Sequence, residues 1–159
     1  MPKGPARAPA AEAPAPKPKG LLASVCKEAS YRVPNLSAAK VRSIAQGFNF
    51  LEGPVWLAQS QSLLFSDMQP ASGPDSVQPS HVRRWSGSKT DTFLENAGTN
   101  GLALGSDGKL YACAHDNESV SIFDLGTKAR SLLVDRVSGK RFNSPNDLTL
   151  RSAGMLYFT

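Results

Sequence analysis

The sequence predicts an all-β protein, and three observations support this fold class. Short apolar segments alternate with turns rich in Gly, Asp, Asn and Ser along most of the chain. A polar residue opens such a segment three times, at Glu52, Asn100 and Asn146, with spacings of 48 and 46 residues. A second apolar segment follows each time. Repeats of about 40 to 50 residues that contain paired strands are typical of β-propeller blades.

The second repeat shows the four strands of one blade most clearly. Its expected strands are residues 101–104, 109–114, 119–125 and 129–135. The first repeat fits the same template with residues 54–57, 62–67, 81–85 and 90–94. The third repeat has two strands before Thr159. In a complete propeller residues 41–48 would form the outer strand of the last blade, and the partners of this strand are expected to be missing from this chain.

The antiparallel order of a blade brings certain polar residues to one rim. In each blade the inner strand begins where the second strand ends, so the start of the inner strand and the end of the second strand lie on the same face of the propeller. We therefore expect Glu52, Asn100 and Asn146 at one mouth, with Asp67 and His115 beside them. A carboxylate and two amide oxygens are ligands that hard cations prefer, and calcium tolerates their irregular geometry. The alternative is structural, because Asn and Asp often open strands by bonding nearby backbone in turns.

Three segments resemble the gluconolactonase, regucalcin and senescence-marker-protein family, also called the SGL group. They are FLEGPVWLAQSQSLLFSD, NGLALGSDGKLYACAHDN and GKRFNSPNDLTLRSAGMLYFT, and the resemblance extends over residues 41–159. It implies a six-bladed propeller that holds one divalent cation, usually calcium, and hydrolyses lactones. The family's EGP motif falls on Glu52 and its ND motif on Asn146, which the resemblance makes metal ligands. The remaining ligands and the catalytic base are expected beyond Thr159.

Three further residues are expected to contact the substrate. Asn100 lies at an inner-strand start, and His115 lies at a second-strand end where the family often has a histidine. Arg141 lies in the connection that leads to Asn146, and its guanidinium could bind a carboxylate or a sugar hydroxyl. The alternatives are a surface-loop histidine and a solvated loop arginine.

The chain length conflicts with a complete propeller. Six blades of about 46 residues need on the order of 280 residues, whereas Glu52 to Thr159 supplies 108. We therefore expect a fragment of about two and a half blades, from a longer product or a truncated gene prediction. The isolated chain is expected to lack activity and to bind calcium weakly.

The first twenty residues have a different composition. They contain six Pro, six Ala, four Lys or Arg and one Glu, and no aromatic or branched aliphatic residue. Such a segment cannot form a core, so we expect a disordered arm over residues 1–20, a linker over 21–40 and the propeller domain over 41–159. The arm carries +3 of the net charge of +5. Without interleaved aromatic residues it is interpreted as a solvated tail, with no nucleic-acid partner.

Other features are interpreted as structural or as evidence on location. No apolar run is long enough to cross a membrane, and no secretory signal is recognised, so cytoplasm is the default location. Cys26 and Cys113 form no metal-binding or disulfide pattern, and Cys113 is expected to be a small buried side chain. Asp124 and Asp135 are expected to serve turns. Three aromatic residues are expected to pack between blades, namely Trp56, Trp85 and Tyr111. His81 follows the long loop 68–80, which is expected on the functional rim as a lid or an insertion.

The function expected of the full-length form is calcium-dependent hydrolysis of a five- or six-membered sugar lactone. A non-catalytic propeller that serves as a binding platform is the alternative from another class, together with a propeller of the strictosidine-synthase-like group. The EGP and ND motifs favour the enzyme. The later asparagine and aspartate of the family's ligand set would discriminate between these alternatives.

Overall fold

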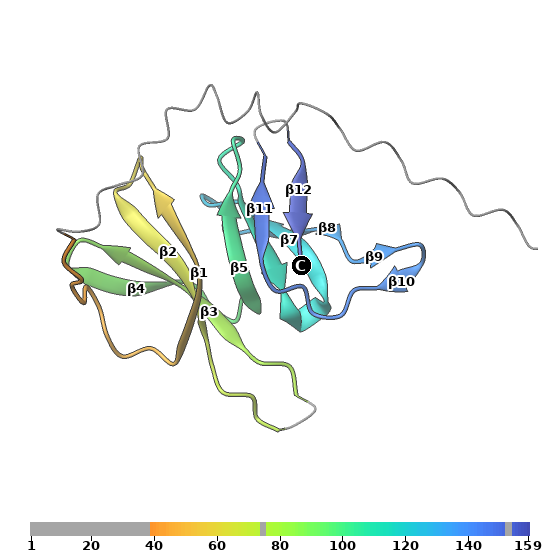
Figure 1. Ribbon diagram of the computed structural model, residues 1–159, viewed down its shortest axis with the longest axis horizontal. Helices are drawn as coiled ribbons and strands as arrows, with labels where there is room; N and C mark the ends of the chain where they lie inside the picture. The colour runs from red at the N-terminus through yellow and green to blue at the C-terminus, as the bar shows by residue number, and fades with distance from the viewer. Residues whose placement is uncertain (1–38, 74–75, 152–153) are drawn as a thin grey trace, which may run out of the picture. The chain divides into compact units, whose positions relative to one another are not determined.

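Two four-stranded antiparallel sheets contain most of the strands, and each sheet has its strands in chain order (Figure 1). The computed structural model describes residues 39–73, 76–151 and 154–159. The first sheet consists of β1 (Phe50–Leu57), β2 (Ser62–Met68), β3 (Ser80–Ser86) and β4 (Lys89–Leu94). The second consists of β5 (Thr99–Leu104), β6 (Leu110–Ala114), β7 (Ser119–Phe123) and β8 (Arg130–Val134). Each sheet is one blade of the predicted architecture, and the all-β prediction is confirmed.

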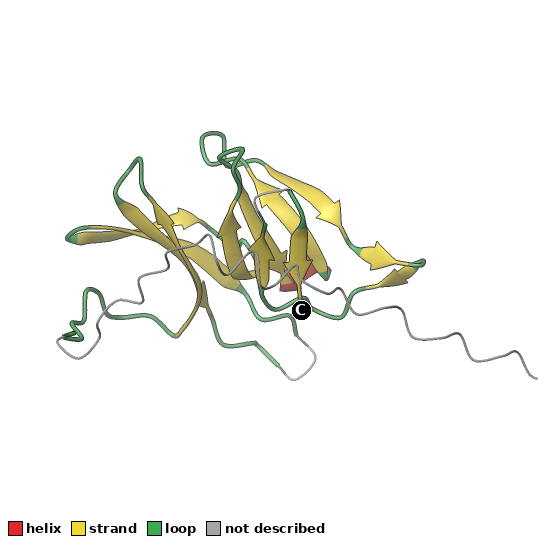
Figure 2. Ribbon diagram, turned by 45° about the horizontal axis from the view of Figure 1, so that its top comes forward, coloured by secondary structure: helices red, strands yellow, loops and turns green. Residues whose placement is uncertain are grey.

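The remaining described elements are short. β11 (Leu148–Leu150) and β12 (Leu156–Phe158) pair with each other and begin the third repeat, as the sequence predicts. β9 (Arg136–Val137) and β10 (Lys140–Arg141) form a hairpin that the sequence analysis did not anticipate. The only helical turn in the described residues is the 3₁₀ turn η2 (His115–Asn117), shown in red in Figure 2.

The chain divides into two compact units, Met1–Val41 and Arg42–Thr159. In the first unit the structure describes residues 39–41, which are exposed and have no regular secondary structure. The expected arm over residues 1–20, most of the linker and Cys26 lie outside the described residues. Both sheets belong to the second unit.

The inner strands of both blades begin earlier than predicted. β1 starts at Phe50, because Leu51 and Glu52 continue the ladder with Asp67 and Ser66 of β2. The register then shifts between Glu52 and Val55, and Gly53 has a φ of +56°. A bulge at this point accommodates the following proline, which has no N–H to donate to a ladder.

The second blade repeats this irregularity. β5 starts at Thr99, which pairs with Ala114, and its register shifts before Leu102. The shift therefore includes Asn100 and Gly101, the counterparts of Glu52 and Gly53. Bulges often lie beside functional sites, where they redirect a side chain.

Residues 41–48, whose partner strands are expected to be missing from this chain, form no outer strand. These residues have no strand structure, and they pair with none of the described strands. A strand without a ladder partner leaves its backbone groups unpaired, so the segment does not persist as one. Phe48 instead packs edge-on against Phe65 of β2, with ring centroids 5.1 Å apart.

One hydrophobic core lies between the two blades. Val55, Leu64 and Val82 of the first sheet pack in the same cluster as Leu102 and Leu110 of the second. Leu110 and Ala112 of β6 alternate in the core, as the period of two predicts, whereas β4 contributes its neighbouring residues Phe93 and Leu94 beside a register shift.

The three aromatic residues expected between blades differ in their environment. Trp56 is 47% exposed, because it lies on the face of β1 opposite the core residue Val55. The prediction is therefore wrong for Trp56. Trp85 and Tyr111 are half-buried.

Hydroxyl groups join the first blade to β5 inside this core. Ser66 Oγ lies 2.8 Å from Thr99 Oγ1 and donates to the Asn100 carbonyl at 2.7 Å. Ser80 Oγ lies 3.4 Å from the same Thr99 hydroxyl. All three side chains are fully buried. The contacts hold the end of β2 against the start of β5.

The change Ser66→Ala is expected to lower the free energy of unfolding by about 1–2 kcal/mol, because it leaves buried polar groups unpaired. Chemical denaturation of both proteins measures this difference. Ser106→Ala is the control, because Ser106 is exposed and its side chain makes no hydrogen bond with another described residue. Equal midpoints for wild type and Ser66→Ala would show that the hydroxyls do not join the blades.

Candidate functional site

Backbone contacts bring the three recurring polar residues to one region. A Cβ atom on Gly53 would lie 2.5 Å from the Leu102 nitrogen and 2.7 Å from the Asn100 oxygen. The Gly101 N–H donates to the Asn146 carbonyl at 2.8 Å. β1 therefore lies against β5, and β5 lies against the segment that leads into β11 (Figure 1). The residue after each of the first two polar residues is glycine because the next inner strand leaves no room for a side chain.

Glu52 lies on the face of β1 that points toward the second blade. It pairs with Ser66, and directly paired residues point to the same face of a sheet. Ser66 in turn donates to the Asn100 carbonyl. Glu52 is half-buried and makes no ion pair or side-chain hydrogen bond with another described residue. Its carboxylate is therefore available as an anionic ligand.

Asn100 is the most buried of the three residues, at 3% exposure. Its Nδ2 lies 3.2 Å from His115 Nε2. Its Oδ1 is buried and has no hydrogen-bond partner. Leaving a buried polar atom unpaired costs about 1–3 kcal/mol, so Oδ1 marks a position where an electropositive group of a ligand fits.

His115 follows the last residue of β6 and begins η2. Its backbone N–H donates to the Gly98 carbonyl at 2.7 Å, which fixes the start of the turn. Burial lowers the pKa of His115 below its usual value, while the nearby Asp116 carboxylate acts in the opposite direction. The imidazole is therefore neutral at pH 7, and one ring nitrogen can accept a hydrogen bond.

Arg141 and His115 line one hollow of about 390 Å³, together with residues of the loop before β3. The Arg141 guanidinium donates to Glu118 Oε2 at 2.9 Å and to the Asn117 carbonyl at 2.8 Å. The hydrogen bond to Glu118 raises the pKa of Arg141. Arg141 thus lies beside His115, with part of its charge compensated by Glu118.

Asn146 precedes β11 and is exposed. Its backbone is fixed on two sides, since its carbonyl accepts from Gly101 and its N–H donates to the Thr159 carbonyl at 2.8 Å. The side chain makes no hydrogen bond with another described residue. Its amide oxygen is therefore free to act as a ligand.

Asp67 does not belong to the expected mouth, although it lies at the predicted end of β2. Its side chain is 1% exposed, its Oδ2 lies 3.0 Å from Arg83 Nε, and its Oδ1 accepts from the Asn49 N–H at 3.0 Å. Neighbouring residues of a strand point to opposite faces. Because Ser66 faces β5, Asp67 faces away from it and serves a structural ion pair.

His81 and the two aspartates interpreted as structural have defined backbone partners. The Asn96 N–H donates to His81 Nδ1 at 3.2 Å, which ties the turn after β4 to β3. Asp124 Oδ1 accepts from the Gly126 and Thr127 N–H groups. Asp135 accepts from the Phe142 N–H through its carbonyl.

The structure adds two residues that the sequence analysis missed. Glu118 has a φ of +52°, and its carboxylate forms an ion pair that orients Arg141. No sequence pattern predicts this ion pair. Asp147 lies where a Cβ on Gly101 would be, and its Oδ1 accepts from the Leu148 N–H at 2.8 Å. The recurrence of glycine after Glu52 and Asn100 was a visible signal for such close contacts between inner strands.

Cys113 is fully buried in β6, as expected. Burial, with a smaller contribution from Asp147, raises the pKa of its thiol to about 12. At pH 7 the thiol is therefore protonated and unreactive. We expect Cys113 to resist iodoacetamide in the folded protein and to react when denaturant is added, as measured by peptide mass spectrometry. Rapid labelling without denaturant would contradict the burial of this strand.

A hard cation fits the chemistry of these residues. Glu52 supplies a carboxylate without a described partner, and the amide oxygen of Asn146 accepts no hydrogen bond from another described residue. No group of three or more His, Cys, Asp or Glu side chains gathers in the part of the chain that the structure describes. A cation held on this rim would be bound by a carboxylate and a neutral amide, a donor set that suits calcium better than a softer metal.

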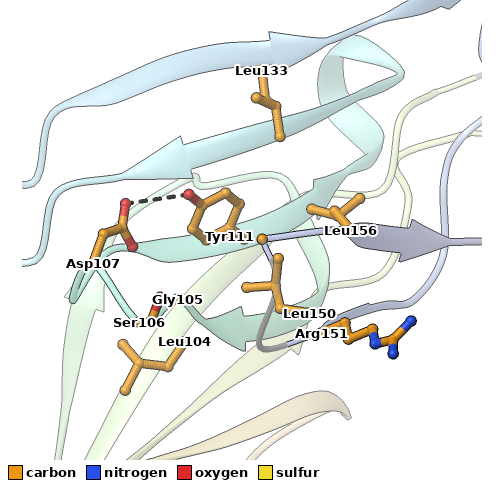
Figure 3. A pocket seen from close by; sticks show the side chains of 10 residues that line it. Leu104, Gly105, Ser106, Asp107, Tyr111, Leu133, Leu150, Arg151 and Leu156 are labelled. Carbon is orange, nitrogen blue, oxygen red and sulfur yellow. Dashed lines mark hydrogen bonds between the residues drawn. The ribbon is translucent and has the colours of Figure 1, made fainter.

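A second hollow, of about 500 Å³, lies at the opposite ends of the inner strands (Figure 3). Leu104 ends β5 and Leu150 ends β11, while Asn100 and Asn146 lie near the starts of these strands. Four leucines line the hollow together with polar residues, and the Tyr111 hydroxyl donates to Asp107 Oδ2 at 3.2 Å. It offers packing surface between β5, β6, β8, β11 and β12.

The chain forms antiparallel four-stranded blades, and polar side chains lie near the starts of their inner strands at one rim. These features define a β-propeller protein with a polar mouth. Within the described residues, no helix is long and apolar enough to cross a membrane.

Comparisons with known proteins specify the family. A profile of the SMP-30/Gluconolactonase/LRE-like region matches residues 50–159, so the chain belongs to this family. A gluconolactonase from Zymomonas mobilis subsp. mobilis is 33% identical, over 75% of this chain and 35% of that protein. The chain thus spans about a third of the length of this curated relative.

Solved structures agree with this assignment. The gluconolactonase from Xanthomonas campestris superposes with a TM-score of 0.61 at 32% identity, over 70% of this chain and 35% of that one. A structural-genomics candidate gluconolactonase superposes with a TM-score of 0.65 at 27% identity, over 77% of this chain and 40% of that one. The propeller architecture and the resemblance given by the sequence motifs are therefore confirmed.

Proposed function

We propose that this chain carries the first part of the active site of a sugar-lactone hydrolase that uses a divalent cation, calcium in the first instance. The observation that carries the proposal is that Glu52, Asn100 and Asn146 lie at or before the starts of three successive inner strands, with the buried Oδ1 of Asn100 unpaired, in a chain of the gluconolactonase family. The natural substrate would be a five- or six-membered sugar lactone.

Each residue of the rim has a role in this proposal. Glu52 would hold the cation as an anionic ligand, and Asn146 would hold it as a neutral one. When bound, the cation supplies Lewis-acid polarisation of the lactone carbonyl and stabilises negative charge that develops on its oxygen. We assign no general base among the described residues.

Asn100 and Arg141 would bind the sugar. The unpaired Oδ1 of Asn100 would accept a hydrogen bond from a substrate hydroxyl, and the hollow beside it would receive the rest of the ring. Arg141, held by Glu118, would donate from that hollow. These contacts would orient the lactone, and removing any one of them should raise KM more than it lowers kcat.

The test is hydrolysis of glucono-δ-lactone by a protein that extends through the complete family domain, followed by acid release at constant pH. We expect turnover above the spontaneous rate, loss of turnover on chelation by EDTA and recovery with calcium. The isolated 159-residue chain is the comparison, and it should show no turnover above the spontaneous rate and weak calcium binding. A folded full-domain protein without turnover would favour a non-catalytic binding platform. Turnover by the isolated chain would contradict the need for later blades.

A further inference from the structure

The buried amide of Asn100 has a defined orientation. Its Nδ2 is directed at His115 Nε2, 3.2 Å away, and its Oδ1 has no partner. An amide that directs its nitrogen to one side must present its oxygen to the other, because the two atoms lie in one plane on the same carbon. Whether the oxygen or the nitrogen of the Asn100 amide faces the rim therefore depends on whether His115 Nε2 accepts or donates the hydrogen bond between them.

His115 is well placed to set this orientation. Its backbone is fixed by the hydrogen bond to Gly98, and its carbonyl accepts from the Glu118 N–H at 3.4 Å, which closes the 3₁₀ turn. Asn100 is fixed as well, since its carbonyl accepts from Ser66. With both backbones held, the remaining variable is which imidazole nitrogen carries the proton.

We propose that His115 is a positioning residue: its Nε2 accepts a hydrogen bond from Asn100 Nδ2 and thereby keeps Asn100 Oδ1 directed to the rim as an acceptor for a substrate hydroxyl. This replaces direct substrate contact as the role of His115. That the ligand of Asn100 is a substrate hydroxyl rests on the proposed function. The orientation of the Asn100 amide does not depend on that function. If Nε2 carried the proton, Asn100 would have to present its amide nitrogen to the rim instead.

The second histidine of the chain provides an internal control. His81 accepts from the Asn96 N–H through Nδ1, so its proton belongs on Nε2. His115 accepts through Nε2, so its proton belongs on Nδ1. The sequence contains only these two histidines. The proposal therefore requires opposite tautomers in one molecule.

Nuclear magnetic resonance of the ¹⁵N-labelled chain tests this requirement directly. Two-bond correlations between ring nitrogens and ring carbon-bound protons distinguish protonated from unprotonated nitrogens. The spectra are recorded about one and a half pH units above the ordinary histidine pKa of about 6.5, and His81→Gln identifies the signals of His115. We expect His115 to be protonated on Nδ1. Protonation on Nε2 would overturn the proposal.

Kinetics of the complete-domain protein test the consequence for the substrate. His115→Phe removes the acceptor, and we expect KM for glucono-δ-lactone to rise about tenfold while kcat changes little, since about one hydrogen bond is lost. His115→Gln keeps an acceptor and should restore most of the affinity, and His81→Gln should behave as wild type. An unchanged KM in His115→Phe would overturn the positioning role. Absence of turnover in the wild type would count against the proposed function alone, because the tautomers are read without substrate.

Discussion

Replacing Gly101 by alanine is expected to destabilise the domain by about 3 kcal/mol or more, a large share of the stability of a typical domain. A Cβ at this position would lie 2.6 Å from the Asp147 Cα and 2.9 Å from the Asn146 oxygen, and it would overlap the Asp147 carboxylate. Two of these atoms belong to the backbone, so a side-chain rotation cannot relieve the contact. The inner strands would have to separate, and the hydrogen bond from Gly101 to Asn146 would be lost with them.

Denaturant unfolding followed by circular dichroism measures this effect. Gly126→Ala is the matched control, because Gly126 has an ordinary φ and a new Cβ would meet only Asp124 Oδ1, at 3.5 Å. That variant should stay within about 0.5 kcal/mol of the wild type. Gly53→Ala should resemble Gly101→Ala, since it combines a φ of +56° with contacts to the β5 backbone. If Gly101→Ala were as stable as the control, the close approach of β5 to Asn146 would be incorrect.

Replacing Glu52 by glutamine is expected to weaken calcium binding of the complete-domain protein by at least about 100-fold and to lower lactone turnover by a similar factor. Even partners that only orient a metal ligand change affinity by about 10- to 100-fold, and here the carboxylate itself is removed. Glutamine preserves the size of the side chain, so the change removes charge without opening a cavity.

Calorimetric titration with calcium and the lactone assay provide the two readings. Glu95→Gln is the control for the charge change, because Glu95 is exposed and makes no ion pair with another described residue. Asn146→Ala should also weaken calcium binding, though by less, because it removes a neutral ligand. Calcium affinity in Glu52→Gln equal to that in Glu95→Gln would remove Glu52 from the metal site.

Much of this fold was accessible from the sequence, because the alternation of apolar and polar residues follows the two faces of each strand. The four strands of the second blade are found close to the expected positions. The early starts of β1 and β5 could not be predicted, since they depend on bulges that keep the ladder running across Gly53 and Gly101. The hairpin of β9 and β10 has exposed strands and so lacks the apolar alternation that identifies a strand.

The site was predictable only in part, for a similar reason. The repeat period identified Glu52, Asn100 and Asn146 as equivalent positions, because equivalent positions of successive blades recur at a constant spacing. The repeat period alone did not reveal the ion pair between Arg83 and Asp67 or the ion pair between Arg141 and Glu118. Such pairs depend on register and on turn geometry, and they join residues that no local pattern connects.

The central claim is that Glu52 and Asn146 hold one cation on the rim formed by the inner strands. A crystal structure of the complete-domain protein soaked with calcium tests it most directly. We expect one calcium ion about 2.3–2.6 Å from a Glu52 carboxylate oxygen and from Asn146 Oδ1. A calcium ion bound elsewhere, with Glu52 directed away from it, would contradict the account.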